Sequence, residues 1–193
     1  RRFGDDLVVT ASFGDATLVH LVASVIPDAD VVLLDTGYLF AETLWYAETL
    51  RSMLDLNLTI VHPDTGPGDA DRWQHDTTGC CGVRKVEPLN RALLGRTGWI
   101  TGLRRVDGPT RANAPVASYD IDRRIVKINP VVAMSDTDID DYHRDHGLPR
   151  NPLTERGYPS IGCWPCTRPV EPGDDRRAGR WSGSEKTECG LHL

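Results

Sequence analysis

Short apolar runs alternate with segments of helical spacing along the first third of the chain. The β-rich run Leu7-Val8-Val9-Thr10-Ala11 is followed by a turn, and apolar residues then recur at helical spacing over 16–26, before Pro27. The continuous apolar run 31–34 is typical of a strand buried on both faces of a parallel sheet. A helix over 41–54 and a strand over 58–61 complete a β-α-β-α-β order, which predicts a doubly wound α/β domain.

The rest of the chain continues this pattern less regularly. Residues 63–79 are polar and rich in Gly, Pro and Asp, and predict a long loop before a helix over about 82–94. Strands are predicted at 99–103 and 124–129. Ser135 with an acidic residue three positions later predicts a capped helix ending near Gly147. The expected fold class is α/β, with a single doubly wound, mostly parallel sheet.

The last quarter of the chain divides the expected protein into two parts. Residues 151–162 are rich in turns and predict a compact segment that leads into Cys163-Trp164-Pro165-Cys166. Residues 1–166 are therefore predicted to form a nucleotide- and metal-binding α/β domain. Residues 167–193 are predicted to be a mobile C-terminal tail, because terminal segments are commonly mobile.

Composition and charge exclude some functions. The formal net charge is −6, whereas general nucleic-acid binding needs a basic surface. No apolar run is long enough to cross a bilayer, and no signal-peptide pattern opens the chain, so we expect a cytoplasmic protein. Disulfides are disfavoured there, so the five cysteines suggest metal or redox chemistry.

Two turns fall where a parallel sheet binds ligands. Ser12–Asp15 and Asp35–Gly37 each follow a predicted strand, and doubly wound sheets bind ligands in the crevice at the carboxyl ends of their strands. A turn that leads into a helix N-terminus can seat an anion. Ordinary βα turns have the same composition, so this pattern alone leaves both interpretations open.

Four of the cysteines form two pairs. Cys163 and Cys166 form a C-x-x-C, which fits zinc, a dithiol redox pair or an iron–sulfur cluster. Cys80 and Cys81 are adjacent, and two neighbouring thiolates reach separate irons of a cluster more easily than one zinc ion. A strained vicinal disulfide and a four-cysteine zinc site remain alternatives. Lys85, four residues after Cys81, would moderate the negative charge of a cluster or lie on a solvated helix face.

The fifth cysteine, Cys189, lies near the C-terminus. A mobile thiol can reach a substrate and then present its product to another protein, provided that cationic neighbours lower its pKa. Arg177, Arg180, Lys186 and His192 are the candidate neighbours. The alternative is a disordered tail with an incidental cysteine.

These residues carry a family resemblance over nearly the whole chain, which resembles the assimilatory adenosine 5′-phosphosulfate (APS) reductases of the wider PAPS/APS reductase family. The matching segments are Leu34–Tyr38, Cys80–Leu89, Trp99–Arg105, Tyr158–Cys166, Gly179–Trp181 and Lys186–His192.

The resemblance implies roles for particular residues. It implies a [4Fe–4S] cluster and a catalytic nucleophile at Cys189. The implied ligands of the cluster are Cys80, Cys81, Cys163 and Cys166. The residues implied to meet the phosphosulfate are Lys85, Arg177, Arg180 and His192. By analogy with adenine-nucleotide α-hydrolases, the nucleotide contacts are Ser12, Gly14, Leu34, Asp35, Thr36, Gly37, Gly102 and Arg104.

The implied reaction is the reduction of APS to sulfite and AMP through an S-sulfocysteine on Cys189, with thioredoxin as reductant, in sulfate assimilation and cysteine biosynthesis. The sequence does not determine the oligomeric state, and a homo-oligomer is one alternative. Reduction of PAPS is the nearest alternative; a non-catalytic zinc-stapled nucleotide-binding protein and a thiol-redox module are others. Ser12-Phe13-Gly14-Asp15-Ala16-Thr17 departs from the glycine-rich, lysine-containing loop of ATP pyrophosphatases, which argues against splitting of ATP.

Overall fold

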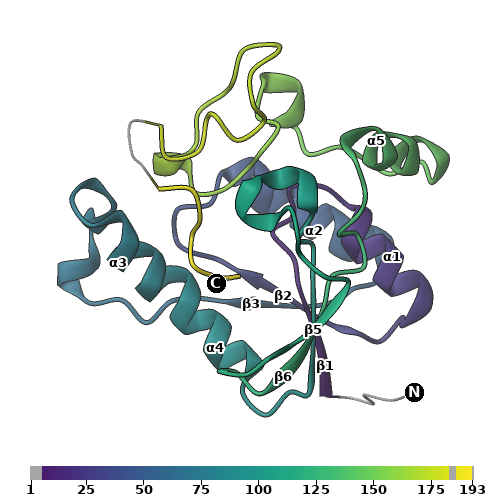
Figure 1. The fold of residues 1–193 in the computed structure, drawn as a ribbon, viewed down its shortest axis with the longest axis horizontal. Coiled ribbons are helices and arrows are strands. Elements are labelled where there is room, and N and C mark those ends of the chain that lie inside the picture. Colours follow the sequence, from purple (N-terminus) through teal and green to yellow (C-terminus); the bar gives the residue numbers. More distant parts are fainter. Residues whose placement is uncertain (1–5, 183–185, 193) are drawn as a thin grey trace.

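A computed structural model describes residues 6–182 and 186–192 of the chain. Its centre is one six-stranded sheet of order β3-β2-β1-β4-β6-β5 (Figure 1). All neighbouring strands are parallel except β5 and β6, which are antiparallel. The strands are β1 (Leu7–Thr10), β2 (Asp30–Leu34), β3 (Asn57–Val61), β4 (Gly98–Thr101), β5 (Ala117–Asp120) and β6 (Ile125–Ile128). The predicted single, mostly parallel α/β sheet is confirmed.

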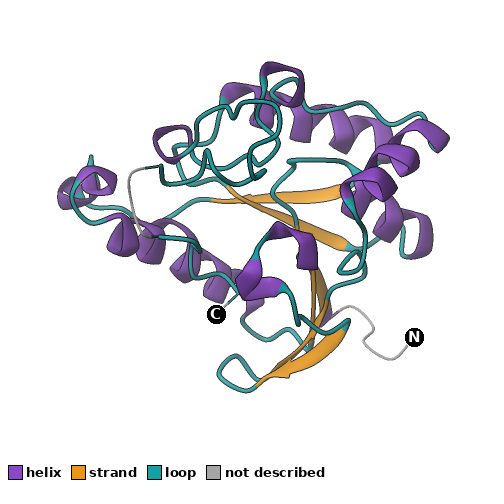
Figure 2. Ribbon diagram, turned by 45° about the horizontal axis from the view of Figure 1, so that its top comes forward, coloured by secondary structure: helices purple, strands orange, loops and turns teal. Residues whose placement is uncertain are grey.

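Helices cover both faces of the sheet (Figure 2). The α-helices are α1 (Thr17–Val25), α2 (Ala41–Leu54), α3 (Thr77–Cys81), α4 (Glu87–Leu93) and α5 (Asp136–Asp145). A π-helical turn, Gly82–Val86, joins α3 to α4. Short 3-10 turns lie at Pro67–Asp69, Arg72–Gln74, Arg105–Asp107, Pro109–Arg111, Thr154–Arg156 and Trp164–Cys166.

The apolar runs of the inner strands bury both of their faces. Successive side chains of a strand point to opposite faces. Val9, Val31 and Ile100 therefore join a core with α1 and α2, and their neighbours Val8, Val32 and Trp99 join a second core with Leu89 and Leu93 of α4. The two cores fix the helices to the sheet and leave the strand ends to build a site.

The order of strands places a switch point between β1 and β4. The chain runs outward from β1 to β2 and β3, and then returns to the other side of β1 as β4. The loops that leave β1 and β4 therefore diverge, and a crevice opens between them at the carboxyl edge of the sheet. This position agrees with the crevice expected from the strand pattern.

Two elements differ from the sequence expectation. The predicted loop 63–79 contains 3-10 turns and the start of α3, so the cysteine pair lies within a helix rather than before one. The Asp76 carboxylate caps α3 by accepting from the backbone N–H of Gly79 at 2.8 Å. The edge strand β5 was not predicted, because Ala117-Ser118-Tyr119-Asp120 carries only one large apolar side chain.

The segment after Cys166 is tied to the body of the protein. Backbone N–H groups of Arg168 and Trp181 donate to the carbonyls of Gly179 and Cys166 at 2.9 Å each, and Trp181 is buried. The described residues 186–192 lie back against the carboxyl edge of the sheet. Within the described part of the chain, no helix is both long and apolar enough to cross a bilayer.

Candidate active site

A cleft of about 500 Å³ opens at the carboxyl ends of β1, β2 and β4. Ser12, Gly14, Leu34, Thr36, Gly102 and Arg104 line it, together with Lys85, Arg177, Arg180, Cys189 and His192. The structure thus brings these eleven sequence-predicted residues to one cavity from segments far apart in the chain.

Two predicted nucleotide residues, Asp35 and Gly37, do not belong to the lining of this cleft. The Asp35 carboxylate accepts from the backbone N–H of Gly37 at 2.9 Å. Gly37 has a φ of +75°, and a Cβ there would lie 3.3 Å from the guanidinium of Arg84. Both residues shape the turn after β2, which lets Thr36 reach the cleft.

The turn after β1 is closed by protein groups. The backbone N–H of Ala16 donates to His143 Nε2 at 3.3 Å, and that of Thr17 donates to Asp15 Oδ1 at 2.8 Å. The Phe13 carbonyl accepts from Asn151 Nδ2 at 3.0 Å. These two amides at the start of α1 are therefore engaged by protein groups and are not offered to a phosphate.

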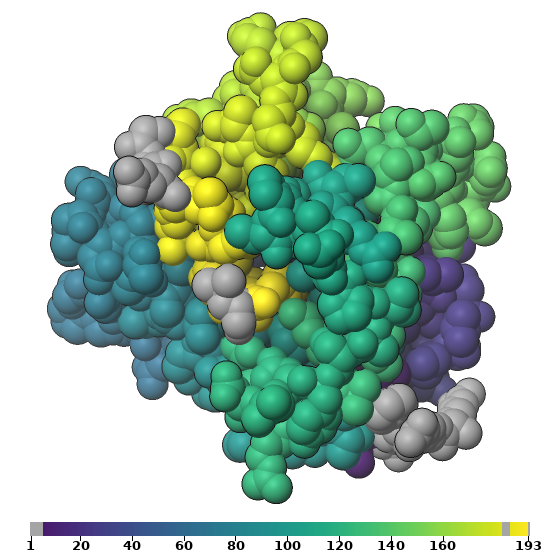
Figure 3. All heavy atoms as spheres, in the orientation of Figure 1, coloured from purple at the N-terminus to yellow at the C-terminus, as the bar shows by residue number. Residues whose placement is uncertain are grey.

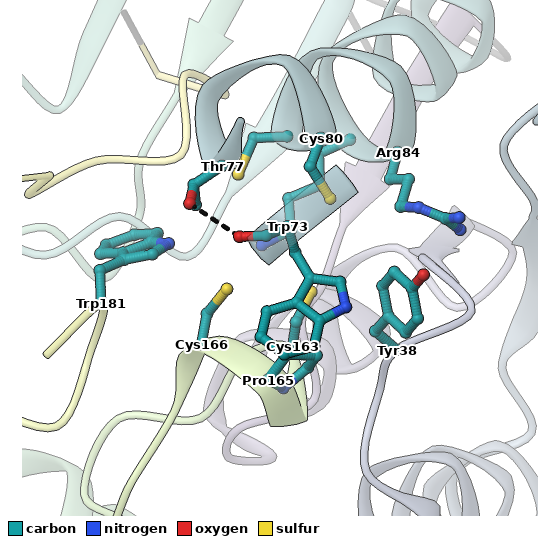
Figure 4. A pocket seen from close by; sticks show the side chains of 11 residues that line it. Tyr38, Trp73, Thr77, Cys80, Arg84, Cys163, Pro165, Cys166 and Trp181 are labelled. Atoms are coloured by element: carbon teal, nitrogen blue, oxygen red, sulfur yellow. Dashed lines mark hydrogen bonds between the residues drawn. The ribbon is translucent and has the colours of Figure 1, made fainter. Parts of the chain in front are cut away.

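A second, smaller cavity holds four thiols next to the cleft. Cys80 and Cys81 reach it from α3, Cys166 reaches it from the turn Trp164–Cys166, and Cys163 from the position before that turn. In Figure 4 the labelled sulfurs of Cys80, Cys163 and Cys166 point into the same space. Burial raises the pKa of Cys80, Cys81 and Cys166 above the ordinary value for a thiol. Among the residues that the structure describes, no three His, Cys, Asp or Glu side chains are grouped as a single metal ion requires.

Local interactions fix the two thiol-bearing segments. Arg72 donates to the capping carboxylate of Asp76 at 2.9 and 3.0 Å, and a side chain at Gly79 would collide with both groups. Thr36 Oγ1 lies 3.2 Å from Cys163 Sγ, and the N–H of Trp164 donates to the Tyr38 carbonyl at 2.8 Å. The C-x-x-C is thus attached to the loop that follows β2.

The π-helical turn separates two cations that are adjacent in sequence. Arg84 donates to the Thr36 carbonyl at 2.8 Å and its guanidinium lies 4.3 Å from the centre of the Tyr38 ring. Lys85 lines both the thiol cavity and the cleft. Burial alone would lower the pKa of Lys85, but the negative charge that Cys163 and Cys189 carry as thiolates holds it above its ordinary value. Lys85 is therefore an ammonium ion placed between the two cavities.

The remaining predicted cations come from the segment before the C-terminus. Arg180 is packed over the Trp181 ring at 4.6 Å and reaches the Ile161 carbonyl at 3.3 Å. Burial, with the charge of Arg177 nearby, lowers the pKa of Arg180. Arg177 donates to the Thr187 carbonyl at 2.8 Å, so it contacts the peptide that carries Cys189.

The C-terminal peptide itself forms part of the wall of the cleft. Figure 3 shows this yellow segment between the blue-teal chain around α3 and α4 and the green-teal chain after β4. Leu191 packs on the core of Leu89 and Trp99. The His192 ring stacks on Trp99, with centroids 5.7 Å apart and planes 15° apart. Cys189 thereby faces the same cleft as the loops after β1 and β4.

Comparison with known proteins agrees with this geometry. Residues 6–169 match the model of a family described as the phosphoadenosine phosphosulfate reductase domain. The chain belongs to this family. An adenosine 5′-phosphosulfate reductase of Mycolicibacterium smegmatis is 46% identical over 198 residues, which cover 100% of this chain and 84% of the relative. One of Mycobacteroides abscessus is 47% identical over 197 residues, covering 99% and 83%.

A solved structure of the reductase family has the same fold. The crystal structure of a phosphoadenylyl-sulfate (PAPS) reductase from Candida auris, a phosphate complex, matches with a TM-score of 0.73 at 27% identity. The match covers 84% of this chain and 83% of that chain. The predicted fold class and the resemblance to the reductase family are thus confirmed.

Sequence reasoning missed several groups in this reductase's cleft. Arg111, Asp107 and Arg176 line it, as does Trp99 beneath His192. No local sequence pattern marks Arg111, because its partner, Glu188, lies 77 residues away in the chain.

Arg104 lines the cleft, but its guanidinium is hydrogen-bonded to other groups of the protein. It donates to Asp107 at 3.1 Å, to Asp136 at 2.9 Å and to the Ser135 carbonyl at 3.3 Å. Arg176 bridges the same two carboxylates at 3.1 and 2.6 Å. This network joins the loop after β4 to the N-terminus of α5 and to the C-terminal segment.

We expect Arg104→Ala to lower the free energy of unfolding by about 2 kcal/mol, because it leaves the half-buried Asp107 with fewer partners. Urea denaturation measures the change. The matched control is Arg105→Ala at the next position, where the side chain is exposed and donates to one carbonyl, that of Ala114. Equal destabilisation by the two substitutions would contradict the role given to the network.

Acid is expected to release the C-terminal peptide through His192. Burial, followed by the charges of Lys127 and Arg111, lowers the pKa of His192 from 6.5 to about 3. A released imidazole regains its ordinary pKa and binds protons that the docked one rejects. Docking is therefore fully favoured above pH 6.5 and weakens as the pH falls toward 3, by about fiftyfold between pH 6.5 and 4.5.

Hydrogen exchange of the peptide 186–192, corrected for intrinsic exchange rates, measures this dependence. Burial would raise the pKa of Glu188, but the Arg111 contact lowers it from 4.5 to about 2, so between pH 6.5 and 4.5 protonation of this carboxylate weakens docking by no more than about twofold. His192→Gln is the control, since its amide does not titrate. A wild-type pH dependence that persists in His192→Gln would rule out the imidazole as its cause.

Proposed function

We propose that this protein reduces adenosine 5′-phosphosulfate to sulfite and AMP, through an S-sulfocysteine on Cys189 and with thioredoxin as the dithiol donor. Family membership and about 45% identity to APS reductases over the full chain make it an oxidoreductase that acts on a sulfur group. The reaction belongs to sulfate assimilation, which supplies cysteine biosynthesis. Its need for reduced thioredoxin favours the cytoplasm as its compartment.

The observation that carries the proposal is the set of cationic residues that line the cleft together with Cys189. Its thiol lines one cleft with Lys85, Arg177 and Arg180, at the strand ends where a doubly wound sheet binds nucleotides. The substrate is an anion and so is the attacking thiolate. Cations placed around the reacting centre reduce their repulsion and stabilise the charge that develops on the leaving phosphate.

The four thiols of the second cavity fit an iron–sulfur cluster. Among the described residues that line this cavity, Cys80, Cys81, Cys163 and Cys166 are the potential metal ligands; Arg84 and Lys85 also line it, and none of these described residues carries a carboxylate or an imidazole. Four thiolates are the usual ligands of a [4Fe–4S] cluster, and the two cations suit its negative charge. When bound, such a cluster would supply a fixed charge and a structural anchor beside the cleft. We assign it no electron transfer.

The first half-reaction transfers the sulfonate group. The Cys189 thiolate attacks the sulfur of APS, an S–S bond forms, and the bond between sulfur and the phosphate oxygen breaks with its electron pair leaving on AMP. Lys85, Arg177 and Arg180 orient the phosphosulfate and neutralise its oxygens. The enzyme is left with S-sulfocysteine.

The second half-reaction is a thiol–disulfide exchange. A thioredoxin thiolate attacks Cys189 Sγ, and the S–S bond to the sulfonate breaks with its electron pair, releasing sulfite. The second thiol of thioredoxin then attacks the mixed disulfide and frees the Cys189 thiolate. The two thioredoxin thiols thereby supply the two electrons gained by sulfur. Because thioredoxin must reach Cys189, the C-terminal peptide has to leave the cleft between the two steps.

Mass spectrometry of the enzyme incubated with APS in the absence of thiol tests the proposal. One sulfonate group should appear on Cys189 and disappear when reduced thioredoxin is added. A protein that produces sulfite without this adduct would contradict the covalent route.

Reduction of PAPS is a second candidate, because the matched family model and the Candida auris structure carry that name. The higher identity to APS reductases favours APS. Comparing kcat/KM for the two nucleotides distinguishes these substrates.

A further inference from the structure

The nucleophile-bearing peptide is anchored through the residue next to the nucleophile. The Glu188 carboxylate accepts two parallel hydrogen bonds from Arg111, at 2.7 Å from Nε and 2.6 Å from Nη2. It also accepts from Thr110 Oγ1 at 2.9 Å, and Arg177 lies 3.7 Å away. Only 10% of the Glu188 side chain and 11% of the Arg111 side chain are exposed.

Arg111 is itself held in place by the body of the protein. It ends the 3-10 turn Pro109–Arg111, and its backbone N–H donates to the Gly108 carbonyl at 3.0 Å. Its Nη1 donates to Asp107 Oδ2 at 3.3 Å. The guanidinium therefore donates one N–H to a fixed carboxylate and presents its Nε and Nη2 donors to Glu188. We call this pair of parallel hydrogen bonds the fork, and the orientation of its donors is set before the peptide docks.

This fork determines where the thiol of Cys189 lies. Consecutive Cα atoms are about 3.8 Å apart, so fixing the Glu188 side chain restricts the Cys189 backbone to a small volume. On the other side of Cys189, Gly190 has a φ of +90° and the peptide continues to Leu191, which is packed on Leu89 and Trp99. Cys189 is thus held on both sides, by the ion pair of Glu188 before it and by the apolar packing of Leu191 after it.

We propose that Glu188 and Arg111 are a positioning pair that holds Cys189 in the cleft for attack and whose separation releases the peptide to its reductant. The attack by Cys189 rests on the proposed function. The docking of the C-terminal peptide through Glu188 and Arg111, which we call the latch, does not. Charge-assisted forks that are largely buried are strong and geometrically specific. Arg177 adds to the link between the peptide and the cleft. It lines the cleft and also donates to the Thr187 carbonyl of the peptide.

The latch is tested on the full-length protein without substrate. The rate at which a maleimide attached to a polymer too large to enter the cleft alkylates Cys189, followed by peptide mass spectrometry, reports how often the peptide is released. We expect Glu188→Gln and Arg111→Met each to raise this rate by about ten- to hundredfold. The double variant should resemble the single variants, because one interaction is lost in all three.

Asp30→Asn is the matched control. It removes a carboxylate from another ion pair, Asp30 with Arg96 at 2.7 Å, at the opposite edge of the sheet. Its alkylation rate should equal that of the wild type. Melting temperatures verify that every variant is folded.

A second readout separates positioning from simple stability. With saturating APS and no thiol, the rate of sulfonate formation on Glu188→Gln should fall about tenfold or more, while the affinity for AMP stays within about twofold. Alkylation of Glu188→Gln at the wild-type rate would overturn the latch. A wild-type enzyme that acquires no sulfonate would instead overturn the proposed function and leave the alkylation result standing.

Discussion

Cys189→Ser is expected to lower the rate of sulfite release by about 10⁴-fold or more, and to abolish the sulfonate adduct. A serine hydroxyl is scarcely ionised at neutral pH and is a much poorer nucleophile toward sulfur than a thiolate. In addition, transfer of the sulfonate to the serine oxygen would give a sulfate ester, which has no S–S bond for thioredoxin to cleave by thiol–disulfide exchange. Sulfite production from APS and reduced thioredoxin measures the loss.

Two controls accompany this substitution. The affinity of Cys189→Ser for AMP should remain within about twofold of the wild type, since the proposed reaction brings this side chain to the sulfonate end of APS, which AMP lacks. Its iron and sulfide content should also be unchanged, because Cys189 belongs to the cleft and not to the four-thiol cavity. Sulfite release at the wild-type rate would show that another group accepts the sulfonate.

Cys163→Ser is expected to lose bound metal as well as activity, whereas Cys189→Ser keeps its metal. This thiol is buried, lies 3.2 Å from Thr36 Oγ1 and lines the cavity with the three other paired cysteines. Its loss should remove most of the bound iron and inorganic sulfide and lower the melting temperature, since ligation stabilises the folded state. Activity should fall by at least about 10²-fold, an effect typical of a lost cofactor anchor.

Metal and sulfide analysis and absorption in the visible range measure the loss of the cluster, and thermal denaturation measures the change in melting temperature. Cys189→Ser is the matched control, because it removes a thiol of the same chain from outside the cavity. A colourless wild-type protein that contains zinc and no sulfide would contradict the assignment of a cluster. A change in cluster oxidation state during steady turnover would contradict the purely electrostatic and structural role.

The sequence carried the information for the sheet because burial leaves a local signature. Residues 31–34 form an unbroken apolar run, and β2 is packed against α2 on one face and α4 on the other. Strand β5 had no such signature, because an edge strand with alternating exposure needs few apolar side chains. The cap of α5 was predicted correctly, since Ser135 and Asp138 interact with each other and need no distant partner.

The site was only partly predictable for a related reason. Cysteine is rare and its spacing is informative, so all five thiols could be singled out from the chain alone. Arginine and aspartate are common, and nothing local distinguishes Arg111, which holds Glu188, from Arg104, which is occupied by Asp107 and Asp136. Asp35 and Gly37 matched the family motif, yet they build the turn rather than line the cleft.

The sequence by itself determined which chemistry is present: a nucleotide-type sheet, two pairs of thiols, one further thiol and a set of cations. The tertiary structure decided which of these groups meet. It placed the cleft beside the four-thiol cavity with Lys85 lining both, and it docked the C-terminal peptide through the Arg111–Glu188 fork and the stacking of His192 on Trp99. Residue types and spacings are local properties of a chain, whereas a bond between residues 77 positions apart exists only once the chain has folded.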